Sequence, residues 1–290
     1  MDDLEQLGDK PVFNIDLVQM GELAQTGVRR AVLFMGLGLN AAAREDFNDY
    51  QLSKLPHAPG QTEMLIDFFP TDLPVERVRE LKAEFAKSVI SSGLRELIEH
   101  YALLLDTIHN YSLVTLQVNG KIGTIDPVKA QKEFKLTPGF SKKFKLLAER
   151  FGIEVPHAAT LTGLYLARNA FTHAFGVVMP NHCSEGREVL AVTWGAFQTI
   201  AVGSDSRQEV SIISLIGKPT TEEMQVKIRQ ITREREYKVG ARVEFSQQDL
   251  SEICAFFGMT LIPETLKAFA DFLSRQCVIE TPPAPTADPA

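Results

Sequence analysis

The strongest constraint on this chain is a run of apolar residues with helical spacing between residues 75 and 109. A period near 3.6 residues predicts amphipathic helix, whose apolar side must be buried against other elements. Two apolar series are present, and their offset predicts a kink near residues 91–93 or two abutting helices. The first series is Val78, Leu81, Phe85 and Val89, and the second is Ile90, Leu94, Leu97, Tyr101, Leu104 and Ile108.

Two more segments read as helices. Residues 141–152 end at Gly152, and residues 158–176 also end at a glycine, as helices often do. Between these and the first helical region, the Asn119-Gly120 pair predicts a small hairpin. We expect the segments at 75–109 and 158–176 to pack against each other, because neither can bury its apolar stripe alone.

The rest of the chain has a different character. Residues 1–74 are rich in proline and are expected to be irregular, apart from a short strand or helix at 28–39. Residues 181–280 read as an α+β extension, and the proline-rich tail 281–290 is expected to be disordered. The extension is predicted to contain strands at 189–194, 196–202, 210–216 and 241–245, a charged helix at 220–236, a helix capped by Ser246, and a last helix at 263–277.

Composition narrows the class of protein. The chain has 290 residues, of which 44% are hydrophobic and 23% charged, as in ordinary soluble domains. Its net charge of -7 argues against a uniformly basic protein that coats nucleic acid. The 3 cysteines are far apart and are expected to be reduced thiols in a cytoplasmic protein. No signal peptide or transmembrane segment is expected.

Familiar catalytic motifs are missing. The 6 histidines lie in no zinc-binding context, and no phosphate-binding loop, kinase signature or serine-hydrolase motif occurs. The sequence therefore predicts neither a metal nor another cofactor.

One short element combines an unusual set of side chains. On a helical wheel of residues 161–175, Arg168 falls inside an apolar arc, where its charge needs partners or a cavity. Asn169 and His173 lie four residues apart, so their side chains can meet. A cation, an amide and a proton-transfer group are what cleavage of an RNA phosphodiester needs, because the 2′-OH can serve as nucleophile. An interior ion pair beside a merely satisfied histidine remains the other interpretation.

The segment RNAFTH, from Arg168 to His173, resembles the RX4–6H motif of the HEPN superfamily of all-helical, ribonuclease-like domains. Asn169 matches the polar residue that commonly follows the arginine. GLREL at 93–97 and SKKFKLLAERFG at 141–152 precede the motif, and the resemblance covers roughly residues 75–180. It implies a mainly α protein in which a HEPN-like helical bundle is followed by the α+β extension.

The resemblance also implies an activity. The implied activity is that of a metal-independent endoribonuclease, a nuclease of the hydrolase type. The implied assembly is a homodimer in which two motifs face one cleft. Arg168 would contact the phosphate, His173 would transfer the proton and Asn169 would orient the site. Many such domains are toxins of toxin–antitoxin systems or antiviral (antiphage) effectors, so an antitoxin or a nucleotidyltransferase is an expected partner. Other members are inert modules that bind RNA, a nucleotide or a protein, and this alternative stays open.

A basic stretch at residues 126–150 bears on the substrate. Its lysines outnumber its acidic residues, and Lys142, Lys143 and Lys145 are candidates to contact an RNA backbone. A solvated helix face is the competing interpretation.

Overall fold

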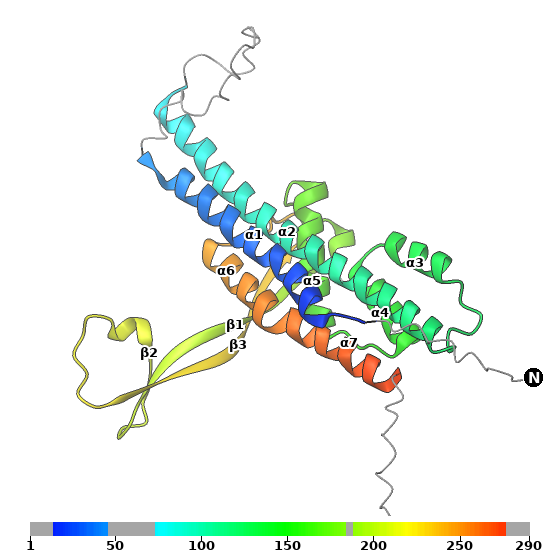
Figure 1. Ribbon diagram of the computed structural model, residues 1–290. Helices are drawn as coiled ribbons and strands as arrows, with labels where there is room; N and C mark the ends of the chain where they lie inside the picture. Colours follow the sequence, from blue (N-terminus) through cyan, green and yellow to red (C-terminus); the bar gives the residue numbers. More distant parts are fainter. Residues whose placement is uncertain (1–13, 46–72, 184–187, 277–290) are drawn as a thin grey trace, which may run out of the picture.

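The computed structural model describes residues 14–45, 73–183 and 188–276 of the chain. Within these residues the protein is mainly helical and carries one small antiparallel sheet (Figure 1). The α-helices are α1 (Leu17–Ala43), α2 (Val75–Val118), α3 (Pro127–Leu136), α4 (Phe140–Phe151), α5 (Ala158–Ala174), α6 (Gln247–Phe256) and α7 (Ile262–Gln276). The strands are β1 (Val189–Gly203), β2 (Glu209–Ser211) and β3 (Met224–Lys238). The prediction of a mainly helical chain with a mixed C-terminal part is confirmed.

The spine of the molecule is α2, one uninterrupted helix of 44 residues. It runs antiparallel to α1 and contacts α5, α6 and α7 (Figure 1). The expected break near residues 91–93 is therefore absent. At Gly93 the side chain of Leu250 in α6 approaches so closely that a Cβ would lie 2.7 Å from its Cδ2. The packing predicted between 75–109 and 158–176 is confirmed by the α2–α5 contact.

The expectation of an irregular segment over residues 1–74 is wrong for α1, which Asp16 caps by accepting a hydrogen bond from the Gln19 N–H. Two of its glycines, Gly27 and Gly38, allow close packing against α2. A Cβ at Gly27 would clash with His100, and one at Gly38 would clash with Val89, both in α2. Residues 46–72, which hold most of the prolines of the segment 1–74, lie outside the described part.

The hairpin predicted around Asn119-Gly120 is also wrong. Helix α2 continues to Val118, and the pair ends it, with Gly120 at a φ of 65° that suits glycine. The helical ends predicted at Gly152 and near Gly176 are confirmed, since α4 stops at Phe151 and α5 at Ala174.

The sheet forms an arm that extends away from the helices (Figure 1). Strands β1 and β3 pair antiparallel over their whole length, and β2 adds to the other edge of β1. The strands predicted at 189–194 and 196–202 are one strand, and that predicted at 210–216 is reduced to β2 and a short 3-10 helix (Ile212–Leu215).

Two other predictions for the extension are wrong. The charged segment 220–236 is strand from Met224 onward and not helix, since its backbone pairs with β1 while most of its side chains are exposed. Residues 241–245 contribute one isolated bridge, Val177 with Arg242, instead of a strand.

The C-terminal helices complete the bundle. Ser246 caps α6 as predicted, and a five-residue π-helical turn joins α6 to α7. The hydrophobic core is continuous from α1 through α2, α5 and α6 to α7. The bundle thus draws its helices from beyond residues 75–180 on both sides. The tail 281–290 lies outside the described part.

Candidate functional site

Helix α5 carries the predicted set of Arg168, Asn169 and His173. Its inward face differs from the predicted arc, because Leu161, Leu164, Ala167 and Ala170 are fully buried whereas Phe175 is 91% exposed. Arg168 therefore lies at the margin of the core, with its side chain 19% exposed. This position lets the guanidinium meet partners and still reach solvent.

Two neighbours fix the Arg168 side chain. Its Nη2 donates to Glu99 Oε1 of α2 at 2.9 Å, and its Nη1 donates to Asn169 Oδ1 at 3.2 Å. Glu99 lies 3.8 Å from a second cation, Arg95. The Nε of Arg168 is buried and has no hydrogen-bond partner among the described residues. Two arginines thus share one carboxylate, which leaves a local excess of positive charge.

His173 lies on the last turn of α5 and is exposed. No hydrogen bond joins it to Asn169 in the part of the chain described, and the Asn169 Oδ1 accepts from Arg168 instead. His182 follows α5 and is buried, and its Nδ1 accepts the Met179 N–H at 3.1 Å. Burial lowers the pKa of His182, and the nearby His173 lowers it further. The site therefore combines a buried histidine whose pKa is lowered with a histidine that is open to solvent.

Glu99 was not foreseen from the sequence. It belongs to α2, and nothing in its local pattern links it to a residue in α5. The nearby Glu96 pairs instead with Arg30 of α1, and its Oε1 lies 3.7 Å from His100 Nδ1. Only the antiparallel packing of α2 against α5 reveals which glutamate faces Arg168.

The three candidate lysines have different surroundings. Lys143 is buried, its Nζ lies 2.6 Å from Asp106 Oδ1 and it stacks over the Phe134 ring, so it faces the core and not a ligand. This corrects the expectation that it contacts RNA. Lys142 and Lys145 are exposed on α4, and Lys145 lies 3.6 Å from Glu149.

The Lys143 pair belongs to a sealed polar cluster between α2, α3 and α4. His109 is fully buried, stacks on Phe134 and lies with its Nδ1 2.6 Å from Gln131 Oε1. Its Nε2 lies 3.4 Å from Arg150 Nη1. Burial lowers the pKa of His109 to about 4, against the smaller raising effect of Gln131. This histidine is therefore neutral and structural.

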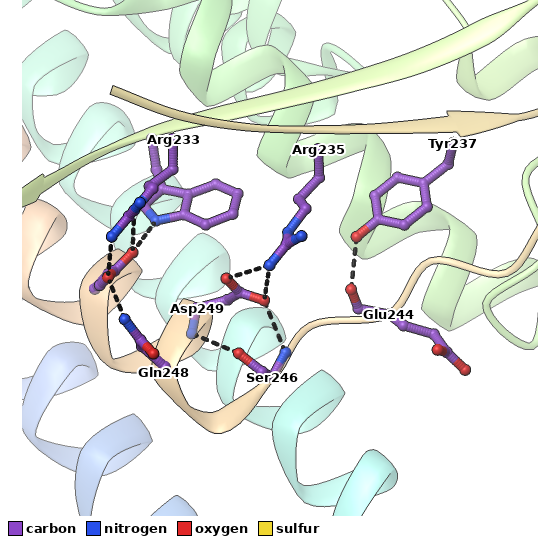
Figure 2. A network of polar contacts seen from close by, with 9 residues as sticks. Arg233, Arg235, Tyr237, Glu244, Ser246, Gln248 and Asp249 are labelled. Carbon is purple, nitrogen blue, oxygen red and sulfur yellow. Dashed lines mark hydrogen bonds and ion pairs between the residues drawn. The ribbon is translucent and has the colours of Figure 1, made fainter. Parts of the chain in front are cut away.

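A groove of about 880 Å³ opens where α2, the end of α5 and β3 meet. Its floor is the polar network of Figure 2, in which Arg235 of β3 bonds both oxygens of Asp249, at 3.2 and 3.3 Å. Asp249 also accepts the Ser246 N–H at the start of α6. Burial would raise the pKa of Asp249, but the bonds from Ser246 and Arg235 outweigh it and hold the pKa below its usual range.

The same interface continues along the arm. The Glu252 carboxylate accepts from Trp194 Nε1 at 3.1 Å and from Arg233, while Tyr237 donates to the Glu244 carbonyl (Figure 2). These contacts fix the base of the sheet against α6. The groove is therefore lined by polar residues that have fixed partners, namely Arg235, Tyr237, Ser246 and Asp249.

The described residues were also compared with the patterns of metal sites and membrane spans. No three His, Cys, Asp or Glu side chains gather there as metal ligands. One continuous helical stretch there, Gln247–Gln276, is long and apolar enough to cross a bilayer, but it is half buried, as a core helix of a soluble protein would be.

Comparison with known protein families, with characterised proteins and with solved structures gave no match to this chain.

Proposed function

We propose that the protein is a metal-independent endoribonuclease of the HEPN type, with Arg168, Asn169 and His173 as its active residues. One observation carries the proposal: α5 holds a partly buried arginine with fixed partners and, five residues later, a solvent-exposed histidine. A fixed cation and an accessible imidazole supply charge stabilisation and proton transfer.

The proposed reaction is an internal transesterification. The 2′-oxygen attacks the neighbouring phosphorus, the P–O2′ bond forms and the P–O5′ bond breaks. Two protons move: His173 takes the 2′ proton or gives a proton to the departing 5′-oxygen, and water carries out the other transfer. Arg168 offers its guanidinium to the phosphoryl oxygens, while Asn169 and Glu99 hold its plane. The products are a 2′,3′-cyclic phosphate and a free 5′-hydroxyl.

We further propose a homodimer in the cytoplasm, because one chain supplies only one arginine–histidine set. A toxin or antiphage effector, controlled by an antitoxin or a nucleotidyltransferase, fits this activity. Lys142 and Lys145 remain proposed contacts to the RNA backbone, and light scattering of the purified protein tests the dimer.

A catalytically inert HEPN-like module that binds RNA, nucleotide or protein is the second candidate. The observation in its favour is that Arg168 already donates to Glu99 and Asn169. In that case Arg168 would serve the fold alone.

The two candidates are separated by incubating labelled single-stranded RNA with the protein in EDTA. The nuclease leaves cyclic phosphate or 3′-phosphate ends by mass spectrometry and spares DNA, which lacks the 2′-OH. We expect Arg168→Ala to lose about 10²–10³-fold in rate, and Asn169→Ala to lose less. Circular dichroism checks that each variant is folded. Binding without cleavage supports the inert module, and dependence on Mg²⁺ contradicts the assignment.

A further inference from the structure

The groove beside α5 exposes a large apolar side chain, that of Phe175, to solvent. Phe175 lines it, is 91% exposed and has a φ of 51°, a left-handed conformation that is costly for a bulky side chain. Such strain concentrates at binding sites. Phe171, one turn earlier, lines the groove as well and packs toward Phe245.

The groove also offers free hydrogen-bond acceptors. Four of its charged lining residues are already joined in pairs, Lys87 with Glu244 and Arg235 with Asp249. Glu84 of α2 and Glu236 of β3 are exposed and have no hydrogen bond or ion pair within the described residues. An ionised carboxylate accepts hydrogen bonds only, so these two side chains suit a part of a ligand that carries N–H donors.

The groove leads toward Arg168 along the seam between α2 and α5. Phe171 lies one turn after Arg168 on α5, and Ser91, another lining residue, lies one turn before Arg95 on α2. From Ser91 to Glu99 the rise along α2 is about 12 Å. That length is on the scale of one or two nucleotides of extended single strand.

We propose that this groove binds a guanine base of the RNA strand held at Arg168, with Phe175 stacking on the base and Glu236 or Glu84 accepting from its Watson–Crick edge. Guanine presents two adjacent donors, N1–H and the N2 amino group, that match the two oxygens of a carboxylate. Single-stranded RNA is recognised in this way, by unstacked bases placed on aromatic rings. Arg242, exposed at the rim, is placed to meet an adjoining phosphate. This inference rests on the proposed function, whose substrate it specifies.

The test measures binding without cleavage. The full chain is titrated into fluorescein-labelled, 2′-O-methylated oligouridine, into the same strand with one guanosine, and into the same strand with inosine there. Inosine keeps N1–H but lacks the amino group. We expect the guanosine strand to bind about 10-fold more tightly than oligouridine, with the inosine strand between them.

Two variants localise the effect. Phe175→Ala should weaken binding of the guanosine strand roughly 10-fold, whereas Phe34→Ala, at an exposed phenylalanine of α1, should not. The double variant Glu84→Gln/Glu236→Gln should make the three strands bind alike, and Glu234→Gln, also on β3, should leave the preference intact.

The outcomes separate the two proposals. Equal affinity for all strands in the wild-type protein, or a preference that survives Phe175→Ala and the double Glu variant, overturns the guanine groove while leaving the nuclease intact. A guanosine preference lost in these variants, in a protein that never cleaves RNA, supports the groove and overturns the nuclease.

Discussion

Two polar clusters are anchored on α2, and they differ in what surrounds them. Near its C-terminal end, His109 and the Lys143–Asp106 pair are covered by α3 and α4, and nearly every donor and acceptor has a partner. Near its middle, Arg168 meets Glu99 at the margin of the core, has one buried nitrogen with no partner in the described part of the chain, and is followed by an exposed histidine. Both clusters hold a histidine, a cation and a carboxylate.

The difference lies in enclosure and not in residue type. A sealed, satisfied cluster contributes to stability and is costly to disturb, whereas an open one contributes little and can interact with a ligand. The comparison therefore predicts opposite responses to mutation. Residues of the sealed cluster should affect folding, and residues of the open cluster should affect activity.

The largest effect on stability is expected from the sealed cluster. Lys143→Ala leaves Asp106 without its cation in a largely buried site, and we expect it to lower the free energy of unfolding by about 3 kcal/mol. Lys142→Ala, at the adjacent exposed position, is the matched control and should change it by less than about 0.5 kcal/mol. Urea denaturation measures both. Similar values for the two variants would show that the Lys143–Asp106 pair is not structural.

An effect of comparable size should come from acid. The pKa of His109 is about 4 in the fold and near 6.5 in the unfolded chain, so the unfolded state binds a proton first as the pH falls. Stability should therefore drop between pH 6.5 and pH 4, by up to about 1.4 kcal/mol per pH unit from this group. Denaturation of the wild type and of His109→Asn at several pH values isolates the contribution. An unchanged slope in the variant would place the acid sensitivity elsewhere.

The smallest stability effect is expected at the open cluster. Arg168→Met keeps the unbranched, apolar first part of the side chain and removes a partly exposed ion pair, together with the Nε that has no partner among the described residues. We expect a change below about 1 kcal/mol, with RNA cleavage nearly lost. A loss of stability as large as that of Lys143→Ala, by the same urea assay, would place Arg168 among the structural residues.

How much of this fold the sequence predicts depends on how far apart in the sequence the contacting residues lie. Local signals worked for α4 and α5, whose apolar periods lie within each helix and whose closing glycines follow shortly after it. They also worked for the Ser246 cap. They failed for α1, where glycines mark contact with α2, and for β3, whose alternating charges hide a strand that only pairing with β1 reveals. The site followed the same rule. Arg168, Asn169 and His173 share one helix and could be recognised together, whereas Glu99 and the groove residues come from distant elements.

The proposed activity of the open cluster is tested most directly by two histidines at opposite ends of α5. His173→Asn removes the exposed imidazole, and His157→Asn makes the same change at the N-cap, where asparagine tolerates the left-handed φ of 56° and the partner is Glu264. Cleavage of single-stranded RNA in EDTA is measured for both. We predict that His173→Asn slows it by about 10²–10⁴-fold and that His157→Asn leaves it close to wild type. Equal rates for folded His173→Asn and wild type would contradict the account.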